Sequence, residues 1–306
     1  MDKTEDFDGH LGLDLPLLAL NDREGDTIPA TMPRVIDSHV HLFPKMIFNA
    51  VWKWFDTHGW PVRYKLGSSE LLNFLFERNI CHVIAFQYAH KPGISTWLND
   101  YMVKKVAEFK GRLTGLATVF PGEDGAIKIL SQAFDQGLKG VKLHVHVQCF
   151  DPLSKAMEPI YELCSLEKKP MVIHAGREPK SSAYSCDPYE LCSVDRIEKV
   201  ICKYPELKLC VPHFGMDEYN GYSSLIQSHD NLWLDTAMAV TDYLPVDPPV
   251  DLLTLRADRI LYGSDFPNIP YAWDRELKCI ESSGLSRESM ERITWKNAAE
   301  LFDILI

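Results

Sequence analysis

The chain has 306 residues, of which 46% are hydrophobic, and 43 acidic against 32 basic residues give a formal net charge of −11 at pH 7. This balance argues against a nucleic-acid or anionic-membrane partner, because both need clustered Lys and Arg. The start of the chain lacks a secretory signal pattern, no apolar run is long enough to span a bilayer, and the eight cysteines are scattered, so we expect a cytoplasmic protein.

Residues 1–32 are predicted to form an N-terminal extension, separate from a domain over residues 33–306. The extension is acidic, with an apolar patch (LGLDLPLLAL) before a turn-forming stretch. It is either a flexible arm or a segment that packs its leucines against the domain or a second subunit. A homo-oligomer is therefore an open alternative.

From Arg34 onward, short apolar runs alternate with longer amphipathic segments, which is typical of βα units around a parallel sheet. The predicted strands are RVID, CHVIAF, LTGLATVF, GVKLHVH, PMVIHA, LKLCVPH, NLWLDT and RILYGS. Eight strands, nearly all followed by a predicted helix, indicate an α/β fold, a single (β/α)₈ barrel. An open doubly wound sheet is disfavoured, because DSHVHLFP follows the first strand where that fold has a glycine-rich phosphate loop.

Two predicted connections are longer than a barrel needs. Residues 42–70 form a loop insertion after the first strand and carry Trp52, Trp54 and Trp60, and residues 175–191 follow the fifth strand. Such loops at the carboxyl ends of barrel strands build the pocket.

Several histidines and one aspartate fall where predicted strands end, and these ends meet at one mouth of a barrel. Alternate residues of a strand share a face, so the HVH of the first strand puts two imidazoles together. Two imidazoles, a third from another strand and one carboxylate suit a divalent ion such as Zn²⁺. A lone histidine at a strand end is usually a hydrogen-bonded core residue, so the conjunction carries the prediction. The residues at these ends are His39, His41, His144, His146, His174, His213 and Asp265.

Six segments resemble the amidohydrolase superfamily, specifically the amidohydrolase-related branch that includes aminocarboxymuconate-semialdehyde decarboxylase. They are VIDSHVHLFP (35–44), GVKLHVHVQ (140–148), PMVIHAG (170–176), CVPHFG (210–215), LYGSDFP (261–267) and WKNAAELF (295–302). They span almost the whole chain from about residue 34.

The resemblance implies that His39, His41, His174 and Asp265 bind the metal. Asp265 would also accept the proton of a metal-activated water, and His213 would act as the acid–base or substrate-polarising histidine. These two are the predicted catalytic residues.

The fourth strand leaves the number of metals open. Binuclear relatives have a carbamylated Lys or a Glu there, and Lys142 is the candidate bridging ligand. One metal is favoured, because the branch usually uses one. The ion is expected to be zinc, with manganese or another transition metal as the alternative. His144 would then face the substrate, and His146 would lie beyond the mouth.

On the substrate side, Arg177 is placed to clamp a carboxylate, or else to pair with a loop acid. Trp52 and its neighbours form either a hydrophobic lid or ordinary packing of the insertion. Asp37 is a candidate partner for the metal ligands.

The expected function is hydrolysis of an amide, lactone or ester bond of a small molecule by a metal-activated water. The close alternative is non-oxidative decarboxylation of an aromatic or unsaturated carboxylic acid, which the same ligand set performs in relatives. A metal-binding protein without turnover is the alternative of another class, disfavoured by the presence of Asp265 and His213.

Overall fold

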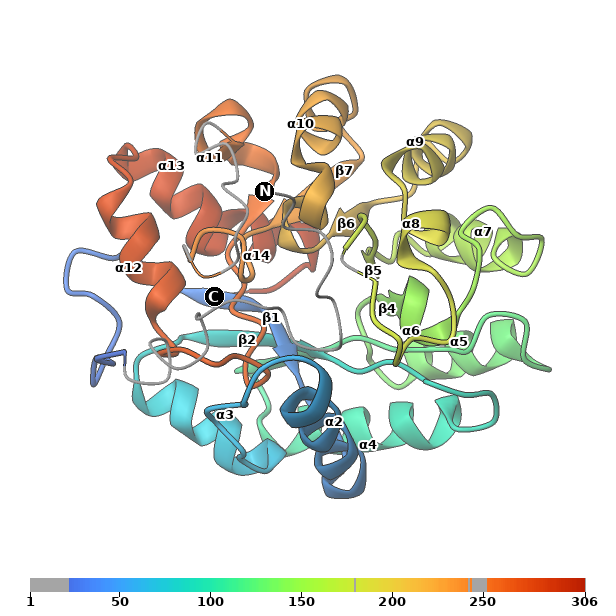
Figure 1. The fold of residues 1–306 in the computed structure, drawn as a ribbon, viewed down its shortest axis with the longest axis horizontal. Coiled ribbons are helices and arrows are strands. Elements are labelled where there is room, and N and C mark those ends of the chain that lie inside the picture. Colours follow the sequence, from blue (N-terminus) through green and yellow to red (C-terminus); the bar gives the residue numbers. More distant parts are fainter. Residues whose placement is uncertain (1–21, 179, 242, 244–251, 306) are drawn as a thin grey trace.

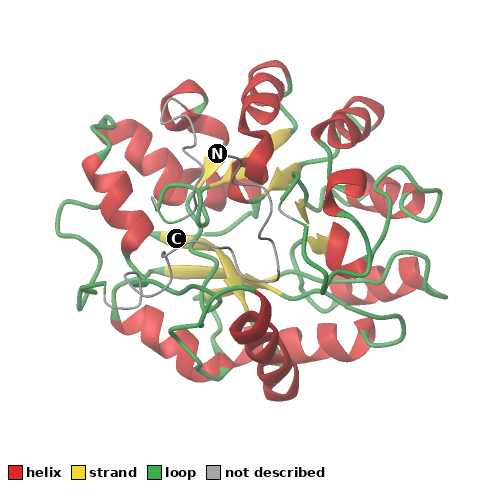
Figure 2. Cartoon of the chain, viewed as in Figure 1, coloured by secondary structure: helices red, strands yellow, loops and turns green. Residues whose placement is uncertain are grey.

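Eight short parallel strands surround the centre of the molecule, and helices cover them on the outside (Figures 1 and 2). This computed structural model describes residues 22–178, 180–241, 243 and 252–305. Each strand overlaps one of the predicted segments. They are β1 Ile36–His41, β2 His82–Phe86, β3 Leu113–Gly115, β4 Val141–His144, β5 Met171–His174, β6 Leu209–Val211, β7 Leu232–Asp235 and β8 Ile260–Leu261.

Neighbouring strands pair in chain order, as β1-β2-β3 and as β4-β5-β6-β7-β8. Single parallel bridges join these two groups, from Ala117 to Val141 and from Val40 to Phe266. Backbone hydrogen bonds support both junctions: the N–H of Lys142 donates to the carbonyl of Ala117 at 2.8 Å, and that of His41 to Phe266 at 2.8 Å. The predicted (β/α)₈ barrel is confirmed.

The longer outer helices bury apolar residues against the strands. In α9, for example, Ile197, Val200 and Ile201 recur at the helical period and are buried, while charged residues face outward. The helices are α2 Lys45–His58, α3 Ser68–Glu77, α4 Ser95–Glu108, α5 Ala126–Asp135, α6 Val145–Gln148, α7 Glu158–Leu166, α8 Pro188–Leu191, α9 Val194–Lys203, α10 Tyr219–Ser228, α11 Leu252–Leu255, α12 Arg275–Ser282, α13 Arg287–Glu291 and α14 Asn297–Leu301, with 3₁₀ segments η1 His213–Glu218 and η2 Ala257–Arg259 and the π-helix η3 Arg292–Lys296.

The described part of the extension, residues 22–32, is tied to the barrel. Asp22 pairs with Arg275 at 2.6 Å, and the N–H of Gly25 donates to Asp274 at 3.0 Å. The apolar patch LGLDLPLLAL lies outside the described residues. The loop insertion after β1 contains helix α2 (Figure 1), which carries Trp52 and Trp54, whereas Trp60 follows the end of the helix.

The fourth strand ends earlier than predicted, and this changes the position of His146. After His144 the chain turns into α6, where Gln148 accepts the N–H of His144 at 2.8 Å and donates to the carbonyls of Ala89 and Val119. His146 is therefore buried at the cavity rather than beyond the mouth, and that expectation was wrong. Among the described residues, no helix has both the length and the apolar character that crossing a bilayer requires.

Candidate active site

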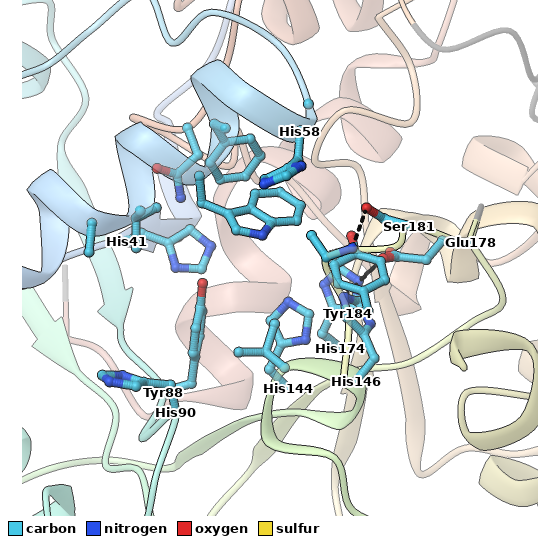
Figure 3. A pocket seen from close by; sticks show the side chains of 18 of the residues that line it. His41, His58, Tyr88, His90, His144, His146, His174, Glu178, Ser181 and Tyr184 are labelled. Carbon is cyan, nitrogen blue, oxygen red and sulfur yellow. Dashed lines mark hydrogen bonds and ion pairs between the residues drawn. The ribbon is translucent and has the colours of Figure 1, made fainter. Parts of the chain in front are cut away.

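A cavity of about 610 Å³ opens at the carboxyl ends of the strands. Its walls are largely aromatic, and its floor carries histidines and carboxylates. Figure 3 shows His41 and Tyr88 on one side, and His144, His146, His174 and Glu178 on the other. The aromatic lining residues are Trp54, Phe55, Trp60, Tyr88, Trp97 and Tyr184.

Three predicted metal ligands meet on the floor. Nε2 of His39 lies 3.3 Å from Nε2 of His41, and Oδ1 of Asp265 lies 3.0 Å from the former and 2.9 Å from the latter. All three side chains are buried. A single proton cannot bridge two facing imidazole nitrogens and a carboxylate oxygen at once, whereas a single metal cation can bind all three atoms. The donor set and its spacing therefore fit a divalent metal.

Charge and protonation agree with this assignment. Burial lowers the pKa of His41 to about 4, so its imidazole is neutral, as a ligand must be. Burial alone would raise the pKa of Asp265, but the adjacent His39 and His41 imidazoles hold it well below its usual range. Asp265 is therefore a carboxylate.

Asp235, at the end of β7, orients His39 and was not predicted. Its Oδ2 lies 2.7 Å from Nδ1 of His39, and its Oδ1 accepts the backbone N–H of His213 at 2.9 Å. Burial alone lowers the pKa of His39, but Asp235 and Asp265 raise it above its ordinary value. A carboxylate behind a ligand histidine fixes the ring and its tautomer. The only sequence signal was an acid at the end of a predicted strand, in NLWLDT.

His213 presents one nitrogen to the cavity. Its Nδ1 lies 2.8 Å from the carbonyl oxygen of Ala237, which can only accept, so Nδ1 carries the proton. Burial lowers the pKa of His213, so the ring is neutral and Nε2 is unprotonated. The backbone has positive φ from His213 to Met216, a strained run, and a side chain at Gly215 would overlap the ring of Tyr222.

Asp37 holds the loop that carries Asp265. Its carboxylate accepts the Ser264 hydroxyl, the N–H of Ser264 at 3.1 Å and the N–H of His39 at 3.2 Å. Asp265 itself has φ +62°, so this support keeps a strained residue in place. Asp37 thus holds the backbone of His39 and the residue before Asp265.

His174, the fourth predicted ligand, belongs to a second cluster. Its ring stacks on that of His144 at 4.0 Å, and its Nε2 lies 3.0 Å from Oε2 of Glu178. Oε1 of Glu178 lies 2.9 Å from Nε2 of His146. Burial lowers the pKa of His174 to about 3, so its ring is neutral. The structure brings His39, His41 and Asp265 together and places His174 with His144 and His146. Glu178 was not predicted for this site.

Lys142 lies in the barrel interior beneath the cavity and does not line it. Its Nζ is 4.5 Å from the centre of the Phe86 ring and has no hydrogen-bond partner among the described residues. Burial lowers its pKa to about 8. Its charge interacts with the carboxylates of Asp235 and Asp265, which oppose the effect of burial on its pKa.

Two predicted substrate contacts lie elsewhere. Arg177 is paired with Glu218 at 3.6 Å and donates to the carbonyl of Tyr189, beside a separate surface hollow. Trp52 stacks on Phe48 at 5.0 Å and does not line the cavity, because its neighbour Trp54 occupies the inward side of α2. His144 does line the cavity.

Comparison with known proteins shows the family. The family model described as "Amidohydrolase" matches residues 36–304, whereas no curated protein matches. Similar solved structures include 5-carboxyvanillate decarboxylase from Sphingomonas paucimobilis (15% identity, TM-score 0.63, covering 89% of this chain and 99% of that one). The 5-carboxyvanillate decarboxylase from Novosphingobium aromaticivorans, complexed with manganese and 4-hydroxy-3-methoxy-5-nitrobenzoic acid, is 16% identical (TM-score 0.65, 92% and 99%). The 2,6-dihydroxybenzoate decarboxylase from Rhizobium is 14% identical (TM-score 0.65, 89% and 99%). The chain belongs to the amidohydrolase family and is one of its metal-dependent (β/α)₈-barrel enzymes.

Proposed function

We propose that this enzyme removes carbon dioxide from a small aromatic carboxylic acid without an oxidant. The observation that carries the proposal is the aromatic wall of the cavity, directly above the cluster of His39, His41 and Asp265. Planar side chains there, such as Trp54 and Tyr88, suit a planar ring by stacking or edge contacts. The decarboxylases among the similar solved structures support this choice over hydrolysis.

In this site His39, His41 and Asp265 would hold the catalytic cation, which we propose to be zinc, with manganese as the alternative. A bound divalent cation supplies positive charge beside the acidic groups of the substrate. The manganese in one similar decarboxylase supports the alternative.

The apolar walls exclude water from the substrate carboxylate. A carboxylate is strongly hydrated, whereas carbon dioxide is neutral, so loss of hydration favours cleavage of the bond between ring and carboxylate. The electron pair of that bond stays on the ring carbon, which takes a proton while carbon dioxide leaves. Solvent replaces the proton, so no oxidant or reductant is needed.

Two side chains can handle the proton. Asp265 is a carboxylate that lines the cavity, so it can accept a proton from a substrate hydroxyl and return it to the ring carbon. His213, with Nδ1–H held by Ala237, presents an unprotonated Nε2 that can accept a hydrogen bond from a substrate hydroxyl.

Hydrolysis of an amide, lactone or ester is the second candidate, and the position of Asp265 favours it. A carboxylate at 2.9–3.0 Å from two metal-ligand nitrogens lies where it can take a proton from an attacking water. The same residues would then act on a carbonyl substrate.

Product analysis separates the two candidates. The metal-loaded protein is incubated with hydroxylated benzoic acids and, separately, with aromatic lactones and amides. Decarboxylation predicts released carbon dioxide and, in heavy water, deuterium at the vacated ring position. Incorporation of ¹⁸O from labelled water into a carboxylate product, with no carbon dioxide, would instead assign hydrolysis. Asp265→Asn serves as the inactive control.

A cytoplasmic location is also part of the proposal. All eight cysteines are free thiols in the structure, and a reducing compartment keeps them so.

A further inference from the structure

Two cysteines meet beside the cavity, one at the end of α6 and one in the loop between β5 and α8. Cys149 follows α6 and is exposed, and Cys186 is partly exposed in that loop. We propose that Cys149 and Cys186 form an oxidisable pair, which a low-molecular-weight disulfide such as glutathione disulfide converts into an intramolecular disulfide bond. The new bond ties the loop that lines the cavity to the end of α6.

The two sulfur atoms share one hydrogen-bond acceptor. Sγ of Cys149 lies 3.3 Å from the carbonyl oxygen of His146, and Sγ of Cys186 lies 3.2 Å from the same oxygen. The Cys149 thiol also forms a side-chain hydrogen bond with that of Cys186. Because both side chains point to one atom, small side-chain rotations bring the sulfurs together, although the residues are far apart in sequence.

The turn that ends α6 holds Cys149 in place. Its backbone has φ +50°, and its N–H donates to the carbonyl of Val145. Gln148 fixes the same turn through the carbonyls of Ala89 and Val119. Positive φ is uncommon for a residue other than glycine, so the surrounding structure keeps the thiol where it stands. One member of the pair is therefore anchored to the barrel.

The other member belongs to a wall of the cavity. The loop between β5 and α8 contributes Glu178, Ser181 and Tyr184 to the lining (Figure 3). The ring of Tyr184 packs against those of His146 at 4.5 Å and Trp54 at 5.5 Å. Cys186 comes two residues after Tyr184 in the chain. A covalent bond at Cys186 therefore restrains the wall that carries Tyr184.

Exposure and acidity set the order in which the two thiols react. Cys149 is exposed, so its thiolate attacks the small disulfide, forms a mixed disulfide and releases one small thiol. Burial and the hydrogen bond from Cys149 raise the pKa of Cys186 to about 12, which makes it a poor nucleophile toward reagents in solution. Cys186 then attacks the Cys149 sulfur and displaces the second small thiol. Two protein thiols are oxidised, one small disulfide is reduced, and the two protons end on the released thiols.

A third thiol lies nearby but is shielded. Sγ of Cys192 is 3.9 Å from Nδ1 of the His146 ring, rather than at the carbonyl, and Cys192 is buried. Burial also raises the pKa of its thiol. A small disulfide therefore reaches Cys149 first, and Cys186 is its partner. In a reducing compartment the pair stays reduced, as in the structure, and a more oxidising state closes it.

Mapping of the disulfide tests the proposal without any substrate. The reduced protein is incubated with glutathione disulfide, the remaining thiols are alkylated, and unreduced peptides are analysed by mass spectrometry. We expect Cys149 joined to Cys186 in the natural protein. Cys186→Ser should stop at a glutathione mixed disulfide on Cys149, and Cys149→Ser should leave Cys186 alkylated. Cys202→Ser, which changes an exposed cysteine on α9, is the matched control and should form the same bond.

Limited digestion with trypsin tests the effect on the loop. Lys180 is exposed, so trypsin can cleave after it, and such cleavage requires local opening of the loop. Oxidation should slow this cleavage severalfold in the natural protein and in Cys202→Ser, but not in Cys186→Ser. Thermal midpoints identify any variant that fails to fold, and the map of the natural protein needs no variant.

Two results of the mapping would overturn the pairing. One is a stable mixed disulfide on Cys149 of the natural protein with Cys186 alkylated, and the other is a bond between Cys186 and Cys192. A bond between Cys149 and Cys186 that leaves cleavage after Lys180 unchanged would reject the restraint on the cavity wall.

Discussion

The carboxylate of Asp235 lies 2.7 Å from Nδ1 of His39, and the same carboxylate accepts the backbone N–H of His213. One buried side chain at the end of β7 thus positions both His39 of β1, the proposed metal ligand, and His213 after β6, the proposed proton-handling histidine. Nδ1 of His39 carries the ring proton and donates it in a hydrogen bond to Asp235. Nε2 is therefore unprotonated and available to bind the cation.

Asp235→Asn should weaken metal binding about 10–100-fold while the protein stays folded. In this variant the side-chain amide oxygen can still accept the backbone N–H of His213. The side-chain NH₂ group then faces Nδ1 of His39. The imidazole would then carry its proton on Nε2, where the cation binds. Competition of the protein with a chromogenic chelator measures the affinity. Asp258→Asn, in the surface ion pairs with Arg256 and Arg259, is the matched control. Equal affinity in the two variants would show that Asp235 does not set the tautomer.

His213→Asn should keep the metal and the fold but lower turnover roughly 10²–10⁴-fold, the range for loss of one acid–base group. His39→Asn should instead lose metal, because it removes a ligand. Metal content, thermal midpoint and rate are measured together for both variants. If the His213 variant loses metal as readily as the His39 variant, His213 is itself a ligand. Near-native turnover would reject the proton-handling role.

Trp54→Ala should raise KM about tenfold or more for an aromatic substrate, since the loss of one aromatic contact is worth about 1 kcal/mol beyond buried area. Trp54 lines the cavity and stacks on Tyr184 at 5.5 Å, which links α2 to the loop after β5. Trp52→Ala is the matched control on the same helix. It should lower the thermal midpoint with little change in KM, because Trp52 packs on Phe48. Steady-state kinetics on both variants check this, and a larger KM effect from Trp52 would restore it as a substrate contact.

Glu276→Gln should flatten the dependence of stability on pH. Burial raises the pKa of Glu276 from 4.5 to about 8, and the carboxyl accepts Tyr271 Oη–H at 2.8 Å and the N–H of Met238 at 3.0 Å. The unfolded chain releases this proton near pH 4.5, whereas the folded protein keeps it until about pH 8. Raising the pH across that window therefore favours unfolding, by on the order of 1 kcal/mol per pH unit.

Urea unfolding of the metal-free protein at several pH values measures this effect. The Gln variant should gain stability relative to the natural protein as the pH rises from 4.5 to 8. Glu198→Gln, on the exposed side of α9, should leave the curve unchanged. Parallel curves for the natural protein and the Glu276 variant would mean that Glu276 is ionised in the folded state.

The sequence determined the barrel and the first cluster of ligands. Strand periodicity placed all eight strands, and the shared direction of parallel strands brought His39, His41 and Asp265 together from opposite ends of the chain. His39 and His41 lie on the regular strand β1, so their shared face follows from backbone geometry that a local pattern encodes. Asp265 follows the end of β8 by four residues, and the direction of the parallel strands places it at the same mouth.

The tertiary structure decided which way the other side chains point. His174 ends the predicted strand, but its ring turns toward Glu178, and His146 is buried because Gln148 fixes a turn against Ala89 and Val119. Arg177 pairs with Glu218, 41 residues away in sequence. Gln148 and Arg177 depend on partners from distant segments, and a local pattern of residues contains no information on which distant group will satisfy a buried polar atom. Glu178 is close to His174 in sequence, but it lies in an irregular loop whose path no strand or helix period predicts.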